Sequence, residues 1–196
     1  MTAASLSWRD LLNQVAKMTC EELTEDALHG LVKRLTIDSA LLAPYIQFTQ
    51  GGYARNVLFR DKKFEAICLC WEAGQYTAVH NHGGSFGVVY VYEGSLDVVT
   101  YGRVDDRATP GKAELANSGE YTIPAGGLLL DRRPSIHKLG NPIGAPRRAV
   151  SLHFYAGPLD VMEIFDPETS QVWEKPMKGE PMIYVEPEAH VMAAMI

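Results

Sequence analysis

The first 45 residues place their apolar side chains at helical spacing, with a leucine or valine every three to four positions. Ser7 and Thr24 are residue types that cap helices, and each precedes one of these apolar runs. A third, shorter helical turn is expected to begin at Asp38 or Ser39 and to end before the proline that follows. The pattern therefore predicts a small helical cap over residues 1–45.

After residue 45 the pattern changes. Short runs rich in Val, Ile, Phe and Tyr are separated by clusters of Gly, Pro, Asp and Asn, which is typical of strands joined by turns. The runs predict strands over residues 53–59, 64–71, 88–92, 96–101, 120–123, 127–130 and 149–155. Many short strands after a helical cap predict a mainly β protein, with an antiparallel barrel or jelly roll.

Length and composition favour one globular domain. The chain has 196 residues, against about 150 for a typical domain. Hydrophobic residues make up 46% and charged residues 21% of it, near the globular average, which excludes a disordered or collagen-like chain. We expect one domain over residues 1–196, in which the cap is followed by a barrel over 46–165 and by a proline-punctuated segment, 166–196, that wraps the barrel.

Charge and cysteine content bear on partners and compartment. The net charge is −6 with no basic stripe, so nucleic acid is not an expected partner. No apolar run approaches the ~20 residues that span a bilayer, and the N-terminus lacks the pattern of a secretory signal. The three cysteines show no disulfide-framework spacing, which is typical of a reducing compartment. We therefore expect a cytoplasmic protein without a membrane partner, and a monomer, since no coiled-coil pattern or broad apolar stripe is present.

Three histidines are candidate metal ligands. His80 and His82 are two residues apart, so on a strand both imidazoles point to the same face. His137 is the third candidate. A pair with this spacing also occurs as structural histidines on a strand, so the spacing alone leaves both interpretations open.

The residues around the pair resemble the first motif of the cupin family. Gly74, His80, His82 and Gly94 have the family's spacing, but Gly87 stands where the family usually has a glutamate ligand. A second motif, with a longer gap than usual before its histidine, follows in Gly119, Pro124, Gly126, His137 and Asn141. Together the two motifs imply a cupin-type antiparallel β-barrel whose metal site has three histidine ligands and no carboxylate.

Three neutral imidazoles leave a divalent ion with its full +2 charge and with open coordination positions. Such a site suits a substrate that brings its own anionic groups. Imidazole ligands suit iron, zinc, copper and nickel, so the ligand set alone leaves the metal open. A three-histidine zinc site is the alternative at this point.

Two further clusters have polar side chains on one strand face. Tyr53 and Arg55 are two residues apart, and a guanidinium group matches a carboxylate in geometry and charge. Ser151, His153 and Tyr155 alternate with apolar residues, so all three point to one face of a strand. If that face is buried, the three side chains must hydrogen-bond, since a buried polar group without a partner costs about 1–3 kcal/mol.

All of these clusters occur together, in the same order along the chain, in the cysteine dioxygenase type I family. The chain resembles a bacterial member from about residue 53 to residue 160 and in its helical cap. The resemblance implies an iron(II)-dependent thiol dioxygenase, acting on a small thiol and O2, that oxidises L-cysteine to cysteine sulfinic acid. It implies ferrous iron on His80, His82 and His137, the substrate carboxylate on Arg55 assisted by Tyr53, and a hydrogen-bonded triad of Ser151, His153 and Tyr155.

Departures from the family narrow what the resemblance implies. Animal members carry a cysteine at the position of Gly87 that cross-links to the tyrosine matching Tyr155, so no thioether cofactor is expected here. The related 3-mercaptopropionate dioxygenases have a glutamine at the position of Arg55 and a second arginine downstream, which residues 156–165 lack. Cysteine is thus the expected substrate, with 3-mercaptopropionate as the alternative. The other alternative is a small-molecule-binding cupin without enzyme activity, whereas cupin isomerases and oxidases usually keep the glutamate.

Overall fold

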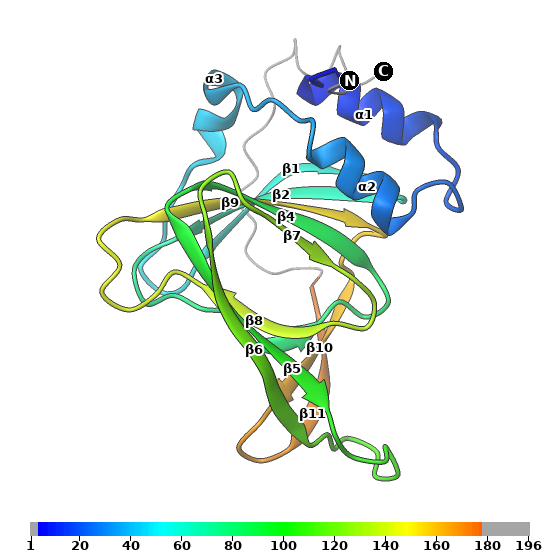
Figure 1. Ribbon diagram of the computed structural model, residues 1–196, viewed down its shortest axis with the longest axis vertical. Coiled ribbons are helices and arrows are strands. Elements are labelled where there is room, and N and C mark those ends of the chain that lie inside the picture. The colour runs from blue at the N-terminus through cyan, green and yellow to red at the C-terminus, as the bar shows by residue number, and fades with distance from the viewer. Residues whose placement is uncertain (1–3, 178–196) are drawn as a thin grey trace.

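The computed structural model describes residues 4–177, which form three layers (Figure 1). A cap of short helices covers one face of a five-stranded antiparallel sheet, and a six-stranded antiparallel sheet packs on the other face. The helices are α1 (Trp8–Lys17), α2 (Glu25–Val32), α3 (Ser39–Leu42) and the 3-10 turn η1 (Ala43–Tyr45). The strands are β1 (Ala54–Arg60), β2 (Phe64–Trp71), β3 (Val79–Asn81), β4 (Phe86–Glu93), β5 (Ser95–Arg103), β6 (Leu115–Pro124), β7 (Leu128–Asp131), β8 (Ile136–Gly140), β9 (Ala149–Ala156), β10 (Val161–Asp166) and β11 (Gln171–Pro176).

The helices begin where the sequence predicts, because each has a side-chain cap. Ser7 Oγ accepts the backbone N–H of Asp10 at 3.1 Å, and Thr24 and Asp38 cap α2 and α3 in the same way. The buried faces of α1 and α2 are Leu11, Leu12, Val15, Leu28, Leu31 and Val32. These side chains form the core between the cap and the five-stranded sheet. None of the helices within residues 4–177 is long and apolar enough to cross a membrane.

Hydrogen bonding orders the strands as β1-β2-β9-β4-β7 in the first sheet and β11-β10-β3-β8-β5-β6 in the second. All seven strand runs predicted from the sequence are present. Strand β6 begins five residues earlier than predicted, at Leu115, and every other end lies within two residues of its expected position. The prediction of a mainly β fold, an antiparallel barrel or jelly roll with a helical cap, is confirmed, and the strands form two antiparallel sheets.

Four strands lie outside the predicted runs: β8, β10, β11 and β3, which was only assumed for the histidine pair. Strand β11 lies in the segment that was expected to wrap the barrel, but it pairs with β10 as the edge strand of the second sheet. Most of its side chains are exposed and its two apolar residues before the proline are adjacent, so it lacks the apolar alternation by which a strand is recognised. The rest of that segment, residues 178–196, lies outside the described residues.

Strand β9 runs through the centre of the first sheet, and its two faces differ. Leu152 and Phe154 face the helical cap and join the core beneath it. Ser151, His153 and Tyr155 alternate with them and point to the opposite face, between the two sheets. Because every residue of β9 is buried, this polar face must find its hydrogen-bond partners inside the protein.

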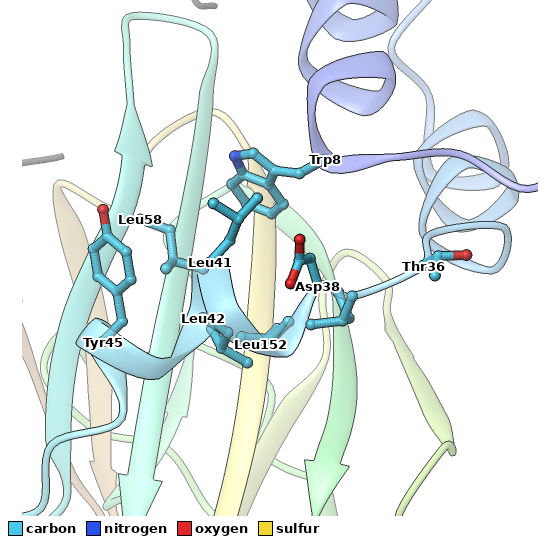
Figure 2. Close-up of a pocket in the computed structure, with 9 residues that line it drawn as sticks. Trp8, Thr36, Asp38, Leu41, Leu42, Tyr45, Leu58 and Leu152 are labelled. Carbon is cyan, nitrogen blue, oxygen red and sulfur yellow. The ribbon is translucent and has the colours of Figure 1, made fainter. Parts of the chain in front are cut away.

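An apolar pocket lies at the junction of the cap and the sheet (Figure 2). Trp8 of α1, Leu41 of α3 and Leu58 of β1 line it together with Leu152 of β9. The cap therefore reaches the strand whose other face carries the polar triad.

Candidate active site

The three candidate metal ligands meet between the sheets. Strand β3 carries His80, His82 follows directly after it, and β8 carries His137, which pairs with His80 across the two strands. The ring centroids are 4.7, 5.0 and 5.2 Å apart, and the ligand atoms lie within 4.8 Å of one another. All three side chains are buried, so none of them is a surface histidine.

The Nδ1 atom of each ring faces an acceptor of the protein. For His80 this is the carbonyl oxygen of Ala78, at 2.9 Å. For His82 and His137 it is the carboxylate of Asp131, with Nδ1 to oxygen distances of 2.6 and 3.6 Å. This leaves Nε2 of each ring for a ligand. In His82 and His137 this atom is buried and has no partner among the described residues, which fits a metal site.

The protonation of the rings also suits metal binding. Burial, reinforced by the charges of the other two histidines, lowers the pKa of His80 well below its ordinary value of 6.5. Burial lowers the pKa of His137 to about 4. Both rings are therefore neutral at physiological pH, which is the form of imidazole that binds a metal.

Gly87 lies directly opposite Tyr155 in the pairing of β4 with β9. A Cβ atom at this position would lie 2.6 Å from Cδ1 and 2.8 Å from Cε1 of the tyrosine ring, far inside van der Waals contact. The Tyr155 ring, 5.0 Å from that of His82 between centroids, thus occupies the space into which a side chain at residue 87 would extend. This arrangement leaves no room for a glutamate ligand and limits the set to the three histidines.

The polar face of β9 forms a continuous hydrogen-bonded chain. Ser151 Oγ lies 2.8 Å from His153 Nε2, and His153 Nδ1 lies 3.0 Å from the hydroxyl of Tyr155. Trp71 extends the chain at its far end, because its Nε1–H donates to Ser151 Oγ at 2.9 Å. All four side chains are buried.

The direction of this chain follows from its first donor. An indole nitrogen only donates, so Ser151 Oγ accepts from Trp71 and can give its own proton to His153 Nε2. His153 then donates from Nδ1 to the oxygen of Tyr155. Burial, helped by the charges of His82 and Arg55, lowers the pKa of His153 to about 3, so one nitrogen accepts and the other donates. The chain leaves the hydroxyl proton of Tyr155 for an acceptor in the site.

Arg55 lies on β1 and is 9% exposed. Its Nη2 is 3.2 Å from Oε1 of Glu65, a fully buried carboxylate that also binds Arg60 at 2.9 Å and accepts the backbone N–H of Leu159. The Nε atom of Arg55 is buried and has no partner among the described residues. Glu65 thus holds one edge of the guanidinium group and leaves a donor for an anionic ligand.

Tyr53 connects the arginine strand to the histidine site. Its ring stacks on Trp71 with centroids 4.5 Å apart. Together with His80 and Met162 it also lines a cavity of about 340 Å³. A ligand in this cavity would contact both a metal-site histidine and the tyrosine predicted to assist Arg55.

Three residues of the site were not predicted from the sequence: Asp131, Glu65 and Trp71. Glu65 could have been found from the sequence, because it is the only charged residue in the apolar run 64–71. A charge in a buried strand needs a partner, and here the partners are arginines. Trp71 ends a predicted strand and Asp131 directly follows another, and an aromatic residue or an acid at such a position carries no particular signal.

The chain is similar to known proteins over most of its length. The family model of cysteine dioxygenase type I matches residues 2–168. The chain is 24% identical over 151 residues to cysteine dioxygenase type 1 of Homo sapiens, which is 76% of this chain and 73% of that protein. It is 25% identical over the same shares to that of Bos taurus. The fold is similar to a solved double-stranded β-helix protein of Klebsiella pneumoniae, with TM-score 0.50 and 15% identity over 63% of this chain and 87% of that one.

Proposed function

Because the chain belongs to the cysteine dioxygenase type I family, we propose that it is an iron(II)-dependent enzyme that oxidises L-cysteine with O2 to cysteine sulfinic acid. One observation carries the proposal. Three buried histidines, two of them with an unpartnered Nε2, lie beside a tyrosine hydroxyl that a hydrogen-bonded chain orients. That arrangement supports a metal site with a hydrogen-bond donor beside it.

In this proposal His80, His82 and His137 hold ferrous iron through Nε2. Bound iron supplies the redox chemistry that joins O2 to a thiol, while the protein supplies binding, orientation and charge. The neutral rings and the orphaned nitrogens fit this metal.

Arg55 binds the substrate carboxylate, and Tyr53 assists it. The free Nε–H of Arg55 and its fixed guanidinium plane suit a carboxylate, which accepts parallel hydrogen bonds from a guanidinium edge. An arginine at this position favours cysteine over 3-mercaptopropionate, whose dioxygenases resemble this chain but have glutamine there. Cysteine is accordingly the substrate that we assign.

Tyr155 acts as a neutral hydrogen-bond donor to oxygen in the site, with Ser151 and His153 orienting it. Burial raises the pKa of Tyr155 well above its ordinary value of 10, so the hydroxyl keeps its proton. His153 occupies one lone pair of the hydroxyl oxygen, which directs the proton away from β9. A preorganised donor of this kind stabilises charge that develops on oxygen.

The remaining expectations belong to the same proposal. We expect no thioether cross-link on Tyr155, because the facing residue is Gly87 and carries no sulfur. We also expect a single domain over residues 1–196 that acts as a cytoplasmic monomer on a small thiol and O2, without nucleic-acid or membrane partners. The net charge of −6 supports the last point.

The test is oxygen uptake by the Fe2+-loaded protein with L-cysteine and 3-mercaptopropionate in parallel. We expect cysteine sulfinic acid as the product, one O2 consumed per thiol, and the higher kcat/KM for cysteine. A tenfold preference for 3-mercaptopropionate would keep the chemistry and overturn the role of Arg55. A protein that binds iron and oxidises neither thiol would be a ligand-binding cupin.

A further inference from the structure

Asp131, the last residue of β7, is an acid enclosed in the interior. Its carboxylate is 1% exposed and lies between His82 and His137. Ser135 donates a hydrogen bond to Oδ1. Oδ2 lies 2.6 Å from Nδ1 of His82 and Oδ1 lies 3.6 Å from Nδ1 of His137, so the carboxylate faces both rings on the side away from Nε2. A carboxylate in this position orients metal-binding histidines and brings a negative charge to the site.

No lysine or arginine among residues 4–177 compensates this charge. Arg132, the next residue, binds Glu25 and Asp26 of the helical cap instead. Removing an ion from water costs several kcal/mol unless an opposite charge replaces the lost hydration. The polar side chains that contact Asp131 are two imidazole rings and one hydroxyl, and a metal ion on the Nε2 side of the rings would supply the opposite charge.

The ligand set has the opposite imbalance. Three neutral imidazoles around a divalent ion leave a charge of +2 in the interior, and Gly87 occupies the position at which a cupin glutamate would reduce it. When the carboxylate of Asp131 is counted with the metal ion and its three ligands, their total charge falls to +1. An anionic thiol substrate then brings it to zero.

We propose that Asp131 is the charge-compensating and positioning carboxylate of this metal site. It orients the rings of His82 and His137 with Nδ1 toward its own oxygens. Although it is not a ligand, it also supplies the negative charge that a glutamate ligand at residue 87 would bring. The inference rests on the proposed function only in taking a divalent metal as the occupant of the three-histidine group. Oδ2 lies 2.6 Å from His82 Nδ1 but off the line of its N–H bond, so charge contributes more than hydrogen-bond alignment.

The first test is the dissociation constant of Co2+, and of Fe2+ under anaerobic conditions, for the wild type and Asp131→Asn. Loss of a partner of this kind weakens metal binding by about 10- to 100-fold, and we expect that range. Glu163→Gln is the matched control, because Glu163 accepts a hydrogen bond from Asn81 of β3 and makes the same acid-to-amide change outside the ligand cluster. Equal metal affinity in Asp131→Asn and the wild type would overturn the inference.

The second readout separates charge from structural damage. In Asp131→Asn the loaded site carries one more positive charge, so azide should bind the Co2+ protein more tightly than it binds the wild type, with a shift of the visible absorption bands. A merely loosened site would bind azide no better. If Asp131→Asn does not fold, Asp131→Glu and Asp131→Gln form a second pair matched in size. The Asp131→Glu variant should then bind Co2+ more tightly than the Asp131→Gln variant. Equal affinities in that pair would also overturn the inference.

These measurements do not depend on turnover. A wild type that binds Fe2+ and oxidises no thiol would refute the proposed function and leave the role of Asp131 standing. Unchanged Co2+ and azide binding in Asp131→Asn would refute the role of Asp131, whatever the activity.

Discussion

A single methyl group at Gly87 tests whether the position of Tyr155 controls the reaction. In Gly87→Ala the new Cβ would lie 2.6 Å from Cδ1 of the Tyr155 ring. Carbon atoms in contact are about 3.5–4.0 Å apart, so the ring or its strand must move by roughly 1 Å. The backbone oxygen of Phe154 would lie 2.8 Å from the same Cβ, so a rotation of the Tyr155 ring alone cannot relieve the crowding.

The displacement should appear mainly in kcat. A misplacement of about 1 Å costs up to roughly 100-fold in rate, and the overpacking should lower the free energy of unfolding by about 1–3 kcal/mol. Iron content should stay near that of the wild type, because β3 and β8 of the other sheet position the metal ligands. Steady-state oxygen uptake, iron analysis and urea unfolding measure the three quantities.

Gly102→Ala is the matched control, because Gly102 also lies in a strand and a Cβ there would meet no atom within 4 Å. It should leave kcat and stability unchanged. A wild-type kcat in Gly87→Ala would refute the argument that the hydroxyl of Tyr155 must be placed accurately. Loss of iron together with activity would show instead that Gly87 acts on the metal site.

Three further predictions concern single groups of the site. Arg55→Ala should raise KM for L-cysteine with iron content unchanged, and an unaltered KM would exclude Arg55 from carboxylate binding. Tyr155→Phe should keep iron but lower kcat by about 100- to 1,000-fold, as loss of a preorganised donor does; wild-type turnover would contradict the donor role. The free energy of unfolding of the metal-free protein should fall as the pH drops from 6.5 toward 3. Over this range His153 binds a proton in the unfolded chain but stays neutral in the folded protein, where its pKa is about 3. His153→Gln should lessen that slope, which is at most about 1.4 kcal/mol per pH unit for each histidine, and an identical slope would assign it to other groups.

The fold was predictable wherever a local signal and the tertiary structure agree. The cap residues Ser7 and Thr24 begin helices because their side chains satisfy backbone N–H groups within the same turn. The run 64–71 is a strand that is buried along its whole length, and its apolar composition predicts such a strand. Strand β11 is an exposed edge strand that hydrogen bonding to β10 stabilises, and such pairing leaves no pattern in its own residues.

The same distinction holds for the candidate site. The histidine pair and the triad of β9 were visible because strand alternation places residues two apart on one face. Asp131 acts through its position between two rings contributed by other segments, so no local spacing announces it. The space above Gly87 likewise depends on the partner strand, where Tyr155 stands opposite, and the sequence shows only a missing glutamate.

Strand β9 explains why the helical cap and the active site are parts of one structure. Its residues alternate between the cap core, which Leu152 and Phe154 join, and the hydrogen-bonded chain that ends at Tyr155. A register slip of one residue would exchange the two faces, placing the triad against the apolar helices and leucine against the histidines. The side chains of the cap that surround the pocket of Figure 2 pack on Leu152 and so help to hold β9 in the register that the triad requires.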